Sequence, residues 1–348
     1  MWLRRTLGLA AGLAGGGIAV ARALRSRRFI DFSGRTVVIS GGSRGLGLVL
    51  ARRFAVEGAR LVLLARDEAE LARAEDDLAA RGARATTIVC DVRNRSDVDA
   101  AIARIVREHQ TIDVLINNAG VIQVGPIAHM TTDDFEDAMA THFWGPLFVI
   151  LAALPHMRTR GARRIVNISS IGGKIAVPHL VPYSASKFAL TGLSEGLRAE
   201  LARDGFLVTT VCPGLMRTGS TYNARFKGRH RSEFAWFHLF DSLPGLSVDA
   251  DVAARRIVEA CRYGDAELII TLTARMAVLL QAMSPSGWSH AMALTNRLLP
   301  SPDRERGTQS RSGWLSTSRL APSFLTMLSD RATIENGELP VSATGLGF

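Results

Sequence analysis

The sequence predicts an α/β fold: a doubly wound parallel sheet of about seven strands in a single domain, with an apolar N-terminal segment and a C-terminal helical extension. Three observations predict it. From Arg35 onward, short apolar runs rich in β-branched residues alternate with segments of helical periodicity. Runs that are apolar at every position are typical of strands buried on both faces of a parallel sheet. The first run ends in a glycine-rich turn, and right-handed crossovers then give a doubly wound sheet.

The elements follow in a regular order. Strands are expected in the apolar runs at 36–40, 61–65, 86–90, 113–117, 164–169, 207–212 and 267–271. Helices are expected between them, at about 45–57, 67–81, 97–109, 133–158, 183–204 and 249–263.

Two parts of the chain depart from this alternation. Segment 215–247 mixes glycine, arginine and aromatic residues without a period. Two weak amphipathic helices follow near 274–283 and 288–299, and we assign no fold to the polar tail from Ser301. The expected parts are an N-terminal segment (1–32), the α/β domain (33–272) with a lid at about 215–247, a helical extension (273–300) and a tail (301–348).

The composition excludes several classes of protein. The 348 residues are 47% hydrophobic, which excludes a disordered chain, and glycine and proline show no fibre-like period. The three cysteines are widely spaced in apolar runs, so they indicate core residues in a reducing compartment. Residues 1–35 contain seven arginines and one aspartate and so supply +6 of the net charge of +10. The rest of the chain is only mildly basic, so we expect no nucleic-acid partner. The cysteines do not have the spacing of zinc ligands, so we expect no metal site.

The N-terminal segment has sixteen uncharged residues, Thr6 to Ala21, between two groups of arginines. A helix of this length spans about 24 Å, short of the ~30 Å hydrocarbon core of a bilayer. Three interpretations stay open: a membrane-associating anchor within residues 1–28, a cleaved export signal, and a disordered or surface-packed extension.

The first strand ends in the turn Ser40-Gly41-Gly42-Ser43-Arg44-Gly45-Leu46-Gly47, and a helix follows directly. Glycines permit a tight turn and let backbone N–H groups approach a pyrophosphate at the helix N-terminus. After the first strand of a βαβ unit, such a turn indicates a dinucleotide site.

Three further motifs accompany the turn: Asn117-Asn118-Ala119-Gly120, Tyr183-Ser-Ala-Ser-Lys187, and Ser170 thirteen residues before the tyrosine. With these in order, residues 34–271 resemble the short-chain dehydrogenase/reductase family, although Ser40 stands where that family usually has threonine. The resemblance implies a Rossmann-like fold and a nicotinamide cofactor. The cofactor-binding residues that we expect are Ser40, Gly41, Ser43, Arg44, Gly45, Leu46, Gly47, Arg66, Asp91, Val92, Asn118, Ala119, Gly120, Tyr183, Lys187, Pro213, Gly214 and Thr218.

The choice between NAD and NADP depends on the end of the second strand. An NAD enzyme places a carboxylate there to bind the ribose 2′-hydroxyl. This chain has Arg66, which together with Arg44 can bind a 2′-phosphate through a guanidinium fork. We interpret Asp67, one residue further on, as the cap of the next helix. The sequence therefore predicts NADP(H).

The chemistry is expected from Tyr183 and Lys187, which share one face of a helix because they are four residues apart. A lysine ammonium ~4 Å from the phenol, at an effective dielectric of ~20, interacts by about 4 kcal/mol, so it lowers the tyrosine pKa. The resemblance adds that Tyr183 donates a proton to the forming alkoxide, that Ser170 binds the same oxygen, and that Lys187 holds the nicotinamide ribose.

One position departs from the family pattern. In Thr141-His142-Phe143-Trp144-Gly145, His142 occupies the place of an asparagine that helps to hold a water leading to the lysine. A histidine there either holds that water and titrates near pH 6.5, or is simply a packed helix residue.

The expected function is hydride transfer between NADP(H) and a carbonyl or secondary alcohol. Aromatic residues in the lid and the apolar N-terminus suggest a hydrophobic small-molecule substrate. The alternatives are an NADP-binding regulatory or scaffolding protein of the same fold, and a membrane-tethered interaction protein. Because NADPH is a cytoplasmic reductant, we expect the protein in the cytoplasm or on the cytoplasmic face of a membrane rather than exported. We also expect a homo-oligomer.

Overall fold

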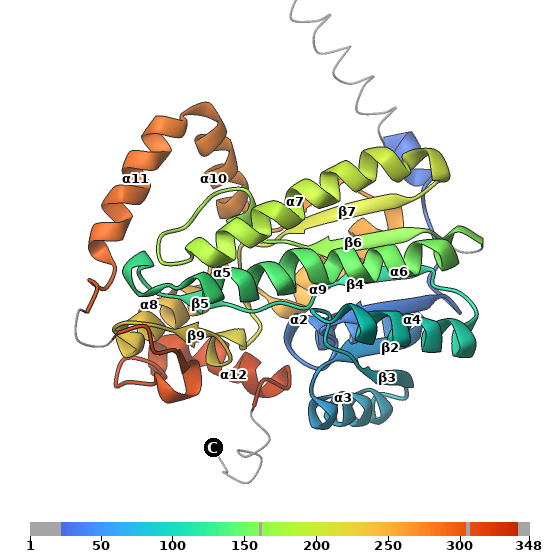
Figure 1. Cartoon of the computed structure of the whole chain (residues 1–348), viewed down its shortest axis with the longest axis horizontal. Helices are drawn as coiled ribbons and strands as arrows, with labels where there is room; N and C mark the ends of the chain where they lie inside the picture. Colours follow the sequence, from blue (N-terminus) through green and yellow to red (C-terminus); the bar gives the residue numbers. More distant parts are fainter. Residues whose placement is uncertain (1–21, 160–161, 304–306, 340–348) are drawn as a thin grey trace, which may run out of the picture.

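The computed structural model describes residues 22–159, 162–303 and 307–339, so the apolar segment 6–21 lies outside the described residues. Seven strands form one parallel sheet in the order β11-β7-β6-β4-β1-β2-β3 (Figure 1). All seven predicted strands are confirmed to within two residues, with the bounds β1 Thr36–Ser40, β2 Arg60–Ala65, β3 Ala85–Val89, β4 Val114–Asn117, β6 Arg164–Ile168, β7 Leu207–Cys212 and β11 Glu267–Ile269.

Helices cover both faces of this sheet, as expected for a doubly wound fold. One face packs against α2 (Gly45–Val56), α3 (Glu68–Ala80) and α9 (Ala250–Tyr263). The other packs against α4 (Arg95–His109), α6 (Gly145–Thr159) and α7 (Val181–Leu201). In Figure 1 the second layer lies in front of the sheet and the first lies behind it.

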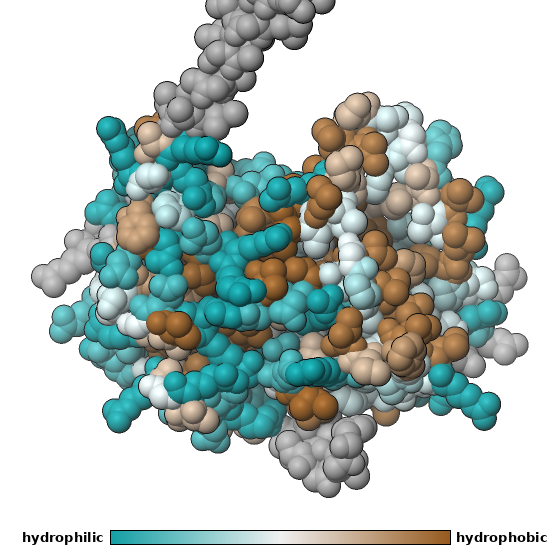
Figure 2. All heavy atoms as spheres, turned by 180° about the vertical axis from the view of Figure 1, so that it is seen from behind, coloured by the Kyte–Doolittle hydropathy of each residue, from teal (hydrophilic) through white to brown (hydrophobic). Residues whose placement is uncertain are grey.

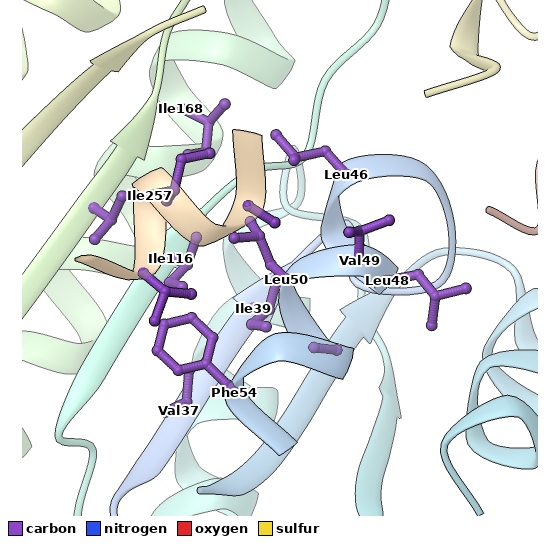
Figure 3. Packing of buried hydrophobic residues seen from close by; sticks show 14 of the residues in the cluster. Val37, Ile39, Leu46, Leu48, Val49, Leu50, Phe54, Ile116, Ile168 and Ile257 are labelled. Carbon is purple, nitrogen blue, oxygen red and sulfur yellow. The ribbon is translucent and has the colours of Figure 1, made fainter. Parts of the chain in front are cut away.

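The core forms because α2 presents one apolar stripe to the sheet. Leu46, Leu50 and Phe54 follow one another at intervals of four residues, and all three are buried. Figure 3 shows Leu50 and Phe54 beside the side chains of Val37 and Ile39 of β1. This packing fixes the N-terminus of α2 directly after the end of β1.

The strand order reverses between β1 and β4, which places a crevice outside the carboxyl ends of these strands. The register pairs Ser40 at the end of β1 with Asn117 at the end of β4. Both glycine-containing motifs therefore begin at the same edge of the sheet, and ligands bind at such a switch point.

The helix predicted at 133–158 is interrupted by one π-helical turn. It consists of α5 (Thr132–Met139), a π-helix over Ala140–Trp144, and α6. In the part of the chain that the structure describes, Thr132–Met157 is the one helix long and apolar enough to cross a membrane, but half of that window is buried inside the protein. It is consistent with a core helix.

The lid and the tail together form a second, smaller core. The lid contains β8 (Leu215–Arg217), β9 (Arg225–Phe226), α8 (His230–Ser242) and β10 (Ser247–Asp249), and β9 pairs with β5 (Gln123–Val124) and β12 (Arg311–Ser312). The tail continues into α12 (Met327–Glu335), which packs beside α8. Short helical turns complete the described chain at 127–129, 171–173, 202–204, 220–222, 313–315 and 324–326.

Residues 307–339 of the tail are folded, although the sequence predicts no fold for the tail from Ser301. The buried side chains of this segment include Ser316, Thr326, Ser329 and Thr333. They are held by hydrogen bonds, such as that from Ser329 Oγ to Asp241 Oδ2 at 3.0 Å, rather than by apolar contacts. A search for apolar periodicity does not detect such a segment.

The two predicted helices after the sheet are confirmed as α10 (Leu272–Met283) and α11 (Pro285–Leu298). They form a hairpin at one corner of the molecule (Figure 1). Ala274 is the one buried residue of α10, and α11 has none.

The body of the domain begins earlier than residue 33. Arg25 forms a bidentate ion pair with Asp265, at 2.8 and 2.9 Å. Phe29 packs edge-on against Tyr263 at 5.7 Å, and Phe32 is fully buried against Phe54. Residues 25–32 therefore belong to the α/β domain by packing, not to the N-terminal segment.

Candidate active site

A cleft of about 670 Å³ lies at the switch point of the sheet, within the range of cofactor sites in proteins. Of the residues expected to bind a cofactor, fourteen line it: Gly41, Ser43, Arg44, Gly45, Leu46, Arg66, Asp91, Val92, Asn118, Ala119, Gly120, Tyr183, Lys187 and Thr218. Ser40, Gly47, Pro213 and Gly214 are not among the lining residues.

The glycine turn needs glycine at two positions for steric reasons. Gly41 has a φ of +65°, and a Cβ on it would lie 2.8 Å from Ala119 Cα. A Cβ on Gly47 would collide with the carbonyl oxygen of Gly41. The two motifs after β1 and β4 are thus in backbone contact, and Gly47 supports the turn from within the protein.

Ser40 supports the same contact with its hydroxyl. Its Oγ accepts hydrogen bonds from the backbone N–H groups of Asn118 and Ala119, at 3.1 and 3.3 Å. The Asn118 amide donates to Gly41 O at 3.0 Å. Ser40 and Asn118 therefore act by holding the two loops together, and Ser40 itself is buried.

Arg66 and Arg44, the two cleft arginines expected to bind a 2′-phosphate, differ in their partners. Arg66 is exposed and makes no ion pair within the residues that the structure describes. Arg44 faces two carboxylates, Glu70 at 3.3 Å and Glu338 at 3.1 Å. Asp67 caps α3 by accepting from Glu70 N at 2.8 Å, which confirms its interpretation as a helix cap.

The end of β6 and the start of α7 bring Ser170, Tyr183 and Lys187 together. Ser170 caps the turn 171–173, and its Oγ accepts from Gly172 N at 3.0 Å. A Cβ on Gly172 would lie 3.2 Å from Tyr183 Cε1 and 3.5 Å from Ser170 Oγ, so the serine and the tyrosine approach each other across this glycine. Lys187 is buried, and its Nζ donates to Ile168 O at 2.8 Å.

The electrostatics of these groups differ from the sequence-based expectation. Burial raises the pKa of Tyr183 above 10, and the hydrogen bond with Ser170 only partly offsets that shift. Burial also lowers the pKa of Lys187 to about 7. The lysine nitrogen lies 5.7 Å from the centre of the tyrosine ring. The expected lowering of the Tyr183 pKa is therefore wrong: loss of hydration is the largest cause of the shift, and the lysine charge does not reverse it.

His142 is fully buried at the π-helix and makes two hydrogen bonds. Its Nε2 accepts from Val121 N at 3.1 Å, and its Nδ1 lies 2.7 Å from Ser186 Oγ. Because Ser186 Oγ donates to Tyr183 O at 2.8 Å, the histidine Nδ1 must donate to it. Burial and the charge of Lys187 lower the pKa of His142 well below 6.5.

His142 is thus a neutral, packed residue and not a group that titrates near pH 6.5. Its ring also lies edge-on to that of Tyr183, at 5.4 Å between centroids. It therefore connects the loop after Gly120 to the first turn of α7, and we classify it as a positioning residue.

Asn223 and Glu338 are among the polar residues of the cleft that were not expected from the sequence. Both line it, and Asn223 Nδ2 donates to Glu338 Oε2 at 2.6 Å. Burial raises the pKa of the Glu338 carboxyl, whereas Arg44 and Asn223 oppose that shift. Neither residue lies in a motif, and Glu338 follows a tail without apolar periodicity, so the sequence contained no signal for them.

Packing within the lid and tail explains most of the aromatic residues of the lid, without a substrate. Tyr222, Phe226, Phe234 and Phe237 are buried in the small core of the lid and tail. Two further lid aromatics, Trp236 and Phe240, are half-buried and exposed, respectively.

Together, the doubly wound sheet, the glycine turn and the Ser170, Tyr183 and Lys187 cluster define an oxidoreductase that uses a nicotinamide cofactor. The family model for short chain dehydrogenases matches residues 35–227. The chain therefore belongs to the short-chain dehydrogenase/reductase family, whose members bind nicotinamide cofactors and act on carbonyl and alcohol groups.

Similar proteins agree with this assignment. A dehydrogenase/reductase SDR family member 7B from Danio rerio is 33% identical over 292 residues, covering 82% of this chain and 93% of the relative. The structure of an actinorhodin polyketide ketoreductase with NADPH has a TM-score of 0.61 at 30% identity, covering 68% of this chain and 96% of that one. L-sorbose reductase from Gluconobacter frateurii, in a complex with NADPH and L-sorbose, has a TM-score of 0.62 at 25% identity, covering 70% and 97%.

Proposed function

We propose that this protein transfers a hydride between NADP(H) and a carbonyl or secondary alcohol. The observation that carries the proposal is the placement of Tyr183 and Lys187 in the wall of a cleft that begins at the Gly41 turn. The turn also suits a dinucleotide chemically, because Gly41 and Gly45 carry no side chains of their own that would cover its backbone.

The bound nicotinamide would supply or accept the hydride at the carbonyl carbon. In reduction, the Tyr183 hydroxyl donates its proton to the carbonyl oxygen as negative charge develops there, and Ser170 Oγ–H donates a hydrogen bond to the same oxygen. A phenol with a raised pKa is protonated at neutral pH, as this direction requires. Lys187 lies one helical turn further on, with its Nζ 5.7 Å from the centre of the Tyr183 ring, where a positive charge would favour the phenolate that forms.

The preference for NADP(H) over NAD(H) is supported by Arg66. It lines the cleft at the end of β2, where an NAD enzyme has a carboxylate. Asp67, the nearest acid, is engaged as a helix cap. Two of the structural relatives contain NADPH.

Cofactor titration tests this preference. We expect NADPH to bind at least tenfold more tightly than NADH, which corresponds to about 1.4 kcal/mol, and Arg66→Asp to reverse the order. The matched control is Arg73→Asp on α3, which does not line the cleft. Equal affinities for the two cofactors in the unmutated protein would refute the preference.

We further propose that the substrate is hydrophobic. Gly214 packs beside Ala274 at the start of α10, so the hairpin lies next to the loop after β7. The α10 side chains Leu272, Met276 and Leu279 are 46–74% exposed. Figure 2 shows apolar surface gathered over this end of the molecule.

A substrate panel tests the class. NADPH oxidation should be faster with hydrophobic ketones than with polar sugars of similar reactivity. Comparable rates with both would refute the hydrophobic class, while leaving the redox function in place. No turnover with any carbonyl or alcohol, despite tight NADPH binding, would instead favour the regulatory or scaffolding alternative.

A further inference from the structure

The end of the tail crosses the cofactor cleft. After α12, the backbone oxygen of Asn336 accepts a hydrogen bond from Gly45 N at 2.8 Å. The Asn336 side chain donates to Thr218 O at 3.3 Å. Gly45 and Thr218 are both residues at which we expect cofactor contacts, and both line the cleft, one at the start of α2 and the other directly after β8. The tail thus uses polar groups that face the cofactor site.

A carboxylate reaches the glycine turn as part of this contact. The side chain of Glu338 is 5% exposed, and its Oε2 lies 3.1 Å from Arg44 Nη1. The other oxygen, Oε1, occupies the space that a Cβ on Gly45 would need, so the glycine makes room for it. Asn223 holds the carboxylate from the lid by donating to Oε2 at 2.6 Å and to the backbone oxygen at 2.9 Å.

This position is one that favours an anion. Gly45 is the first residue of α2, and backbone N–H groups and the helix dipole at such an end attract negative charge. Arg44 adds a full positive charge beside it. A cofactor phosphate would seek the same two partners. In this structure the Glu338 carboxylate already engages Arg44, and the backbone oxygen of Asn336 engages the Gly45 N–H.

We propose that Glu338 competes with the phosphate groups of the cofactor for Arg44 and the Gly45 turn, and so lowers the affinity for NADP(H). This inference rests on the proposed function of the cleft as a nicotinamide site. When the tail is docked, the carboxylate repels the phosphates; cofactor binding therefore requires the end of the tail to move. The apparent affinity is then the intrinsic affinity multiplied by the fraction of molecules whose tail is displaced.

The test is NADPH binding by the full-length protein, measured by fluorescence and by calorimetry, with Glu338→Gln. The glutamine keeps the size and the hydrogen bond to Asn223 but removes the charge. We expect at least a tenfold decrease in the dissociation constant for NADPH. The matched control is Glu335→Gln, three residues earlier, whose carboxylate pairs with Arg331 on the surface and should leave the affinity unchanged.

A second measurement needs no variant. In the unmutated protein, NADPH should increase amide hydrogen exchange over residues 336–339, because the tail leaves the turn. Greater protection of these amides, or weaker NADPH binding by Glu338→Gln, would mean that the tail clamps the cofactor and would overturn the proposal. An unchanged affinity would also overturn it, while leaving the proposed function intact. Failure of both proteins to bind NADPH or NADH would instead refute the proposed function.

Discussion

Tyr183 is the residue whose hydroxyl the proposed reaction requires. Tyr183→Phe removes the proton donor and keeps the ring that packs against His142. We expect turnover to fall by about 10²–10⁴-fold, with cofactor affinity little changed. Steady-state kinetics and NADPH titration measure the two effects. Tyr263→Phe, on α9 and outside the cleft, serves as the control, and unchanged turnover in Tyr183→Phe would refute the mechanism.

Lys187 makes the protein less stable at neutral pH than it would be without this charge. Its pKa is about 7 in the folded protein against ~10.4 in an unfolded chain. Between about pH 7 and pH 10 only the unfolded chain holds the proton, so the free energy of unfolding rises with pH, by up to about 1.4 kcal/mol per unit. Lys187→Met should abolish this slope.

Urea unfolding at several pH values measures how the free energy of unfolding changes with pH. The control is Lys174→Met: Lys174 is paired with Glu195 and Glu267, its pKa is raised, and its removal should keep the slope. Identical pH dependence in Lys187→Met and the unmutated protein would contradict the lowered pKa.

Asp330, a partly buried acid, makes several of the polar contacts of helix α12. Asp330 accepts from Tyr222 Oη at 2.6 Å and Thr326 Oγ1 at 2.8 Å, and it also bonds His238 Nε2 at 2.9 Å. Asp330→Ala leaves these three groups without their partner, at a cost of about 1–3 kcal/mol or more. We expect faster hydrogen exchange across Met327–Glu335 while the main sheet stays protected.

The same helix provides the control for this experiment. Glu335 at the end of α12 is exposed and pairs with Arg331 on the surface, so Glu335→Ala should leave the exchange of α12 nearly unchanged. Equal protection of α12 in Asp330→Ala and the unmutated protein would show that apolar contacts, not this cluster, hold the helix.

The strands and the cleft could be predicted from sequence because both depend on local patterns. Apolar runs identify the buried strands, and glycine is required wherever two backbones touch, as at Gly41 and Gly47. The tail was missed because most of its buried side chains are polar, such as Ser329, whose partner Asp241 lies far away in the sequence. The tyrosine pKa was misjudged because burial is a property of the whole fold and not of a four-residue spacing.

The N-terminal segment gives a prediction about where the protein lies in the cell. We propose that residues 1–28 associate with a membrane, because an apolar stretch and the exposed Arg22, Arg27 and Arg28 suit anionic lipid. Arg25 is already paired with Asp265. The full-length protein should therefore fractionate with membranes, and a chain starting at Arg22 should stay in the supernatant with equal activity.

The start of this shorter chain follows from the structure. A start at Phe32 would remove the contacts of Arg25 and Phe29 with the domain and would confound location with stability. N-terminal sequencing of the mature protein provides the second readout. A new terminus near residue 22 would mean that the segment is a cleaved signal.

The hairpin of α10 and α11 has a consequence for how the molecule unfolds. A helix of 14 residues is marginal in water by itself, and α11 has no buried residue to stabilise it. The hairpin is therefore expected to melt at a lower temperature than the sheet. Far-UV circular dichroism should show a gradual loss of helix before the main cooperative transition, absent from a near-UV trace that follows the aromatic core. A single coincident transition would mean that another surface covers the hairpin in solution.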